Sequence, residues 1–258
     1  GEKPLDRLVD GYSYTSVFRK IAFIGDSLSS GEFENRDRDG KNTYVDMFDY
    51  SWGQYIARKN GLTAYNFSRG GMTTKWYMES FAEEKGFWNP ELAAQAYVIA
   101  LGYNDLYGKH CELGSFEDID QNDYRNNKLT FYGQYAAIIA KYKEISPDAK
   151  FFLVTFCNYS DREDLKEITA KMVEALYKIA GIFDNTYVID LYKYGPDYDR
   201  KFKDNYFMYG HMTATGYVFT AKMIDSYIDY IIRHNQSDFK TVSYIGTDCY
   251  YKGKKDVN

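Results

Sequence analysis

The sequence predicts an α/β protein in which helices cover both faces of a mostly parallel sheet. Short apolar runs alternate with amphipathic segments along the 258 residues, which is typical of repeated strand–helix units. A chain of this length can form one large domain with a well-developed core. Because no internal repeat or linker interrupts the alternation, we expect a single domain over 1–258, with its core at about 20–233 and a polar tail at 235–258.

The expected strands are short apolar runs, and the expected helices are longer segments that begin at polar caps. Strands are expected at about 20–25, 63–67, 95–101, 149–156 and 186–191. Helices are expected at about 51–60, 73–85, 130–145, 161–180 and 213–233. Ser51, Asp161 and Thr213 are the predicted N-caps. A short strand is also expected in the tail, at 241–245.

Breaker residues set several of these boundaries. Gly25 ends the first apolar run, and Pro147 stops the helix that begins near residue 130. Gly181 ends the helix that follows Asp161. Each breaker therefore separates a strand from a helix, as repeated strand–helix units require.

The first strand ends in a motif that can carry chemistry. Gly25-Asp26-Ser27-Leu28 follows the apolar run at 21–24 directly, so Ser27 stands at the carboxyl end of the strand. Open α/β sheets place their sites at this end. A Ser in a turn is usually only a capping residue, so it becomes a candidate nucleophile only if other segments supply its partners.

Three later segments supply such partners in order. The segment 66–73 contains Gly70-Gly71, the segment 102–105 contains Asn104, and the segment 210–213 contains His211. With Ser27, they resemble the four sequence blocks of the GDSL, or SGNH, hydrolase family, and the resemblance covers roughly residues 20–233. It implies a flavodoxin-like three-layer α/β/α sandwich with a five-stranded parallel sheet in the order 2-1-3-4-5.

The resemblance also implies the roles of these residues. Ser27 is the expected nucleophile, and His211 is the base that removes its proton. The oxyanion hole is expected from the backbone N–H groups of Ser27 and Gly71 and from the side-chain amide of Asn104. Position also favours His211 over the two other histidines, since His234 ends a long helix and His110 lies in a polar loop.

One position departs from the family pattern. The family carries an Asp three residues before its His, whereas this chain has Met208 there. Either a backbone carbonyl near Met208 orients the imidazole, or another carboxylate such as Asp204 or Asp190 reaches it. A Ser27–His211 dyad oriented by a backbone carbonyl is the favoured interpretation.

Two long connections distinguish this chain. The segments 29–50 and 103–129 exceed the usual strand-to-helix connection, and both leave strands that carry a site block. Their polar and aromatic composition suits a soluble ester, such as an acylated sugar, better than a lipid. The alternative is that they are solvated loops with a few aromatic anchors.

Composition excludes several classes of protein. The net charge is −5 and no dense Lys/Arg run occurs, so no nucleic-acid partner is expected. No apolar run approaches the roughly 18 residues of a membrane span, and the N-terminal residues do not form an intact signal peptide. The three Cys form neither a disulfide framework nor a metal site, and Cys157 is expected to be a buried apolar side chain. No cofactor or metal is expected, and location and oligomeric state stay open.

The sequence therefore predicts a serine esterase that hydrolyses a short-chain acyl ester, with an acylated carbohydrate as a candidate substrate, through an acyl-enzyme on Ser27. The alternatives are a non-catalytic binding protein that retains the fold, or a lipase- or thioesterase-type member of the family.

Overall fold

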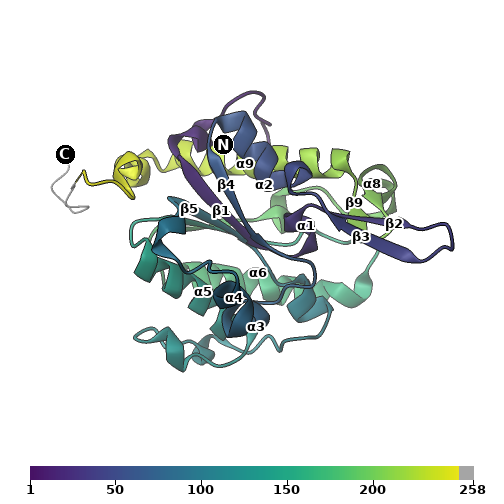
Figure 1. Cartoon of the computed structure of the whole chain (residues 1–258), viewed down its shortest axis with the longest axis horizontal. Helices are drawn as coiled ribbons and strands as arrows, with labels where there is room; N and C mark the ends of the chain where they lie inside the picture. The colour runs from purple at the N-terminus through teal and green to yellow at the C-terminus, as the bar shows by residue number, and fades with distance from the viewer. Residues whose placement is uncertain (250–258) are drawn as a thin grey trace.

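A five-stranded parallel sheet forms the middle layer of the molecule (Figure 1). The computed structural model describes residues 1–249, and its main strands lie in the order β4-β1-β5-β6-β7. These strands are β4 (Thr63–Ser68), β1 (Lys20–Gly25), β5 (Ala96–Ala100), β6 (Lys150–Val154) and β7 (Thr186–Ile189). Every neighbouring pair is parallel. Counted along the chain, the order is 2-1-3-4-5, which confirms the predicted fold class.

Helices cover both faces of this sheet. In Figure 1, α2 (Trp52–Asn60) and α9 (Ala214–His234) lie above the sheet. Below it lie α5 (Phe131–Ile145) and α6 (Lys166–Ala180). Successive strand residues point to opposite faces, so the core divides into two buried clusters.

The N-caps show which helix starts the sequence predicted correctly. Ser51 accepts a hydrogen bond from the Gln54 N–H, and Thr213 accepts one from the Gly216 N–H, so both predicted caps are confirmed. The prediction for Asp161 is wrong, because α6 begins only at Lys166, after a 3-10 turn. Asp161 instead pairs with Lys203 at 3.2 Å.

Three further segments differ from the predicted pattern. The helix expected at 73–85 contains a π-helical turn at Tyr77–Phe81 between α3 (Thr74–Trp76) and α4 (Ala82–Glu84). The strand expected at 241–245 is absent from the described residues, and 3-10 turns at Gln236–Phe239 and Val242–Tyr244 lie there instead. Phe239 and Val242 in these turns are buried in the core, so the segment packs against the domain without joining a sheet. The end of the predicted tail, 250–258, lies outside the described residues.

The segment 29–50 is not a loop throughout. It contains an antiparallel hairpin, β2 (Glu32–Arg36) and β3 (Asn42–Asp46), in which Glu32 pairs with Asp46. Figure 1 shows this hairpin extending away from the sheet, beside α8 (Arg200–Tyr206) and β9 (His211–Met212). β9 pairs with β8 (Phe207–Met208). The hairpin therefore brings residues near the N-terminus next to the segment that carries His211.

Two short helices complete the carboxyl edge of the sheet. α1 (Ser27–Ser30) follows β1 directly, and α7 (Leu191–Tyr194) follows β7. The other long connection, 103–129, contains a π-helical turn at Tyr103–Tyr107 and two 3-10 turns. Both segments that the sequence assigned to loops therefore contain regular structure.

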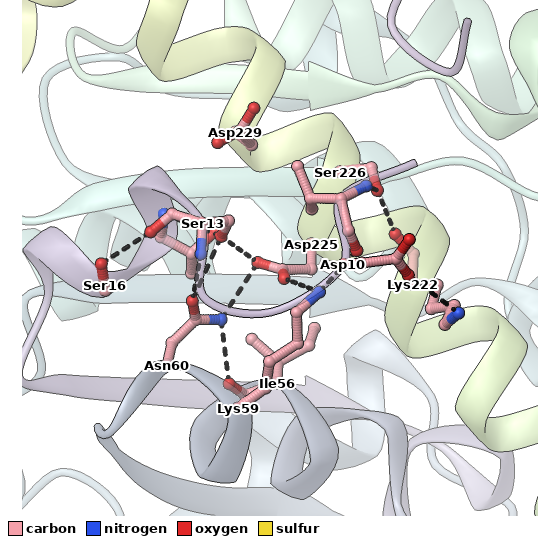
Figure 2. A network of polar contacts seen from close by, with 12 residues as sticks. Asp10, Ser13, Ser16, Ile56, Lys59, Asn60, Lys222, Asp225, Ser226 and Asp229 are labelled. Atoms are coloured by element: carbon pink, nitrogen blue, oxygen red, sulfur yellow. Dashed lines mark hydrogen bonds and ion pairs between the residues drawn. The ribbon is translucent and has the colours of Figure 1, made fainter. Parts of the chain in front are cut away.

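A buried polar network fastens the N-terminal segment to α2 and α9 (Figure 2). Asp225 on α9 accepts hydrogen bonds from Ser13 Oγ at 2.7 Å and from Asn60 Nδ2 at 3.2 Å, and it pairs with Lys59 Nζ at 2.9 Å. One turn further along α9, Asp229 accepts a hydrogen bond from the Tyr14 N–H at 2.9 Å. We call these contacts the α9 network.

Candidate active site

Ser27 is the first residue of α1, and Asp26 alone separates it from the end of β1. Asp26 caps this short helix, because its Oδ1 accepts a hydrogen bond from the Leu28 N–H at 3.0 Å. Burial raises the pKa of Asp26 to about 6, and the nearby carboxyl of Asp105 adds to this effect. Ser27 lines a cavity of about 410 Å³ together with Asn104 and His211. The structure thus brings together three of the four predicted site positions.

The fourth position, Gly71, does not line this cavity, but its neighbour Met72 contacts Asn104, which does. Its φ of +75° is in the left-handed region that favours glycine, which explains the residue type. Asn104 Nδ2 donates to the carbonyl of Met72 at 3.2 Å and so fastens the third block to the second. Because an amide nitrogen carries two N–H donors, this contact leaves one for a ligand.

His211 stands in the short hairpin of β8 and β9, with Tyr209 and Gly210 in its turn. Its Nδ1 lies 2.9 Å from Glu34 Oε2, and the Gly210 N–H donates to the same oxygen at 2.9 Å. Glu34 comes from β2, 177 residues away in sequence. A carboxylate on Nδ1 is the arrangement that fixes the tautomer and orientation of a catalytic imidazole.

The surroundings of Glu34 keep it ionised. Burial alone would raise its pKa, but hydrogen bonds from His211, Arg36 and the Gly210 N–H outweigh burial and hold the pKa below the ordinary value. Arg36 pairs with Glu34 at 3.0 Å, and its guanidinium lies 3.8 Å from the centre of the Tyr209 ring. The carboxylate that contacts His211 is therefore charged and held in place.

The other ring nitrogen of His211 also contacts a carboxylate. Glu32 Oε2 lies 2.9 Å from Nε2. Burial raises the pKa of Glu32, although His211 acts in the opposite direction. Within residues 1–249, Ser27 Oγ makes no hydrogen bond to His211. In this arrangement the imidazole lies between two carboxylates, Glu34 on Nδ1 and Glu32 on Nε2, and it makes no hydrogen bond to Ser27.

These contacts correct the predicted alternatives for orienting His211. Asp204 is exposed on α8, and Asp190 caps α7 and accepts a hydrogen bond from Tyr177 at 2.7 Å, so neither contacts the imidazole. The expectation of a backbone carbonyl near Met208 is also wrong, because a side-chain carboxylate occupies Nδ1. The Met208 side chain itself is exposed.

The sequence interpretation missed both glutamates. It assigned 29–50 to a loop, although residues two apart on a strand share a face, and Glu32 and Glu34 fit that spacing. Gly70 and Gly210 make room for them. A Cβ on Gly70 would stand 2.7 Å from Glu32 Oε1, and one on Gly210 would stand 3.0 Å from Glu34 Oε2. The spacing of two between the glutamates, together with the glycines in the site blocks, could have indicated that both carboxylates lie on one face near the site.

The remaining candidates lie outside the cavity. His110 is exposed in its loop, and His234 ends α9, where its Nδ1 contacts the Tyr230 carbonyl at 2.8 Å. Cys157 is buried, as predicted. Over the described part of the chain, no cluster of His, Cys, Asp or Glu has the arrangement of a metal site. Nor does any helix there have the length and apolarity that crossing a membrane requires.

The fold and this edge of the sheet define a class of protein: a three-layer α/β/α sandwich with Ser, Asn and His on one cavity. The model of the GDSL-like Lipase/Acylhydrolase family matches residues 23–219, and the chain belongs to this family of hydrolases. No curated protein matches the chain in sequence.

Solved structures similar to this chain share its fold. One is a family two carbohydrate esterase from Clostridium thermocellum in complex with cellohexaose, with a TM-score of 0.59 and 16% identity over 90% of this chain and 67% of that chain. Another is a family 3 carbohydrate esterase from the same organism, with a TM-score of 0.53 and 16% identity over 84% of this chain and 98% of that chain. A putative GDSL-like lipase from Bacteroides uniformis has a TM-score of 0.53 and 17% identity over 84% of this chain and 96% of that chain.

Proposed function

We propose that this chain is a serine esterase that removes short acyl groups from carbohydrate esters through an acyl-enzyme on Ser27. The observation that carries the proposal is a single cavity lined by Ser27, Asn104 and His211, with Glu34 on Nδ1 of the imidazole. Family membership supports ester hydrolysis, and the carbohydrate esterases of the same fold support the substrate class.

The proposed reaction has two halves. Ser27 Oγ forms a bond to the ester carbonyl carbon, and its proton passes to His211 Nε2. The negative charge on the carbonyl oxygen is stabilised by N–H donors of Ser27, Gly71 and Asn104. The carbon–oxygen bond to the alcohol then breaks, and the alcohol oxygen takes the proton from Nε2. Water repeats the sequence on the acyl-enzyme, releases the acid and restores Ser27.

In this mechanism Glu34 is a positioning residue. It holds Nδ1 protonated and stabilises the positive charge that the ring carries after it accepts the proton. The Gly210 N–H, which donates to the same carboxylate oxygen, fixes the position of that oxygen relative to the ring. The catalytic unit we propose is therefore a Ser27–His211–Glu34 triad, with its acid on a hairpin instead of in the block that carries the histidine.

A small apolar cavity supports a short acyl group. Its volume is about 80 Å³, and it shares Asp26, Leu28, Tyr103 and Tyr159 with the larger cavity that holds Ser27. An apolar cavity of about 150 Å³ is known to hold benzene, so a space of about 80 Å³ accommodates a group of roughly three heavy atoms. An acetyl group fits that size, whereas a long lipid chain does not.

The alternative functions make different predictions. A binding protein that retains the fold would not form a covalent adduct with a fluorophosphonate, because trapping this reagent requires an activated serine. A lipase-type enzyme would prefer long acyl chains, which the polar hairpin and the small apolar cavity do not favour.

The test is labelling of the purified chain with a fluorophosphonate, followed by mass spectrometry of the labelled peptide. We expect one adduct per chain on Ser27, none in Ser27→Ala, and strongly reduced labelling in His211→Ala. Acetylated xylosides and p-nitrophenyl acetate should be hydrolysed by the wild type, with a loss of at least about 10³-fold in kcat for each variant. Full activity of Ser27→Ala would overturn the proposal.

A further inference from the structure

The carboxylate of Glu32 contacts Nε2 of His211, the ring nitrogen that the proposed reaction uses. As a general base, His211 must accept the proton of Ser27 at Nε2, yet Glu32 Oε2 lies 2.9 Å from this atom. Glu34 already contacts Nδ1. With Glu32 in this position, Nε2 is not available to Ser27.

Glu32 is held in place by the fold but has few polar partners. It lies five residues after Ser27 at the start of β2, and its backbone carbonyl accepts a hydrogen bond from the Tyr217 hydroxyl at 2.5 Å. Its carboxylate lies against Gly70, where any Cβ would collide with it. Within the part of the chain that the structure describes, His211 is the one group within ion-pair or hydrogen-bond distance of this carboxylate.

A buried carboxylate that moves away from its one partner must find other donors. The Glu32 side chain is only 15% exposed, so few water molecules can reach its carboxylate to replace His211. A sugar ester brings hydroxyl groups next to the oxygen that will leave. These O–H groups can donate to Glu32 at the moment when the ester oxygen approaches Nε2.

From these contacts, and resting on the proposed function above, we propose that Glu32 is a specificity-determining residue that covers His211 Nε2 until a leaving group with neighbouring hydroxyls replaces the imidazole as its partner. A phenyl or ethyl ester provides no such donors. With those substrates, Glu32 returns to Nε2 and competes with Ser27 for the base. The residue therefore favours polyhydroxylated leaving groups and selects against simple alcohols.

The experiment compares two substrates in three variants. A monoacetylated methyl xyloside with a free hydroxyl beside the ester represents the sugar, and phenyl acetate represents the simple ester. The variants are Glu32→Ala, Glu32→Gln and, as a matched control, Asp39→Ala, which removes a charge from the exposed turn of the same hairpin. The measurement is the ratio of kcat/KM for the sugar ester to kcat/KM for phenyl acetate.

We expect Glu32→Ala to lower this ratio by about tenfold to a hundredfold, the effect of losing one hydrogen bond to a charged group. The loss should come both from slower sugar-ester hydrolysis and from faster phenyl acetate hydrolysis. Asp39→Ala should keep the wild-type ratio. A Glu32→Ala ratio within twofold of the wild type would overturn the proposal.

Glu32→Gln separates the two effects of the carboxylate. The amide retains a carbonyl acceptor for a sugar hydroxyl, but it is uncharged and therefore holds the ring of His211 less strongly. We expect its phenyl acetate hydrolysis to rise as in Glu32→Ala while most of its sugar-ester activity is kept. If Glu32→Ala fails to fold, the nearly isosteric Glu32→Gln provides the test. An unchanged rate of phenyl acetate hydrolysis in folded Glu32→Gln would contradict the proposed role of Glu32.

Fluorophosphonate labelling distinguishes the two proposals. The reagent contains no sugar, so uncovering Nε2 should accelerate labelling of Ser27 several-fold in both Glu32 variants. If neither the wild type nor the Glu32 variants are labelled, the esterase proposal itself fails. If the wild type is labelled and hydrolyses both esters, but the Glu32 variants have unchanged labelling rates and an unchanged substrate ratio, the role of Glu32 alone fails.

Discussion

The α9 network and the His211 site both bury carboxylates, but they use them differently. The side chains of Asp225 and Glu34 are 1% and 7% exposed, so burial does not distinguish them. The two carboxylates differ in their partners, and Figure 2 shows the partners of Asp225. Asp225 contacts Lys59, Asn60 and Ser13, whose side-chain types have no ordinary pKa near neutrality. Glu34 contacts an imidazole, the side chain whose ordinary pKa lies closest to neutrality.

The surroundings of the two regions differ as well. Lys59 Nζ also donates to the Val9 carbonyl, so the cation of the α9 network is held by two fixed acceptors. His211 instead borders the cavity of about 410 Å³. A buried carboxylate therefore stabilises the fold where fixed donors surround it, and it can serve chemistry where its partner is an imidazole beside a cavity.

Glu34→Gln gives the largest effect that this comparison predicts. An amide on Nδ1 favours the wrong tautomer of His211, so we expect kcat to fall by up to about 10⁴-fold, with a melting temperature close to that of the wild type. The pKa of Glu34 is lowered in the folded protein, so the stabilisation by its ionised carboxylate is fully present above about pH 4.3. This stabilisation is lost only as the pH falls through the folded-state pKa of Glu34. The carboxylate is therefore ionised in assays at about pH 7 to 8.

The matched control is Asn35→Ala, on the opposite face of the same strand, which should change neither kcat nor the melting temperature. Retained activity in Glu34→Gln would show that the carboxylate does not position the base.

Asp225→Asn should have the opposite profile. It leaves Lys59 without its carboxylate in a mostly buried place, and breaking such a pair costs about 3 kcal/mol of unfolding free energy. We expect a lower midpoint in urea denaturation and an unchanged kcat/KM for acetyl esters at a temperature where the variant is folded.

Asp10→Asn serves as the control for this variant. Its carboxylate pairs with Lys222 on the surface at 3.2 Å with a side chain that is 87% exposed, so the midpoint should barely move. A fall in kcat/KM of folded Asp225→Asn, with stability unchanged, would contradict the division between the two regions.

Asn104→Ala tests whether a neutral polar group at the cavity also acts in the reaction. If its amide stabilises the oxyanion, kcat should fall by about 10²–10³-fold with little change in KM. The loss of its contact with Met72 gives a second readout, since a structural role would show as a lower melting temperature. A change confined to KM would make Asn104 a substrate-binding residue instead.

The smallest expected effect concerns acyl length. Because the apolar cavity beside Ser27 measures about 80 Å³, acetyl esters should be hydrolysed faster than butyryl esters, and butyryl faster than twelve-carbon esters. The measurement is kcat/KM on p-nitrophenyl esters below the concentration at which micelles form. A preference for the twelve-carbon ester would show that this cavity does not bind the acyl group.

The features that depend on local pattern could be predicted from the sequence. Apolar runs, caps such as Ser51 and Thr213, and breakers such as Gly25 specify strands and helices over a few residues, and their alternation implies the parallel sheet. The motif that contains Ser27 could be recognised for the same reason. These features need no knowledge of distant contacts.

The groups that surround His211 could be identified only in the folded protein. Glu34 lies 177 residues from His211 in the sequence. The charged segment that contains Glu34 resembled a loop, because its short strand lacks a sustained alternation of apolar and polar residues. Pairing with β3 places Glu32 and Glu34 on one side, and packing of β2 against β9 sets them on the two nitrogens of one ring. A contact of this kind arises from the packing of distant segments, which no local pattern encodes.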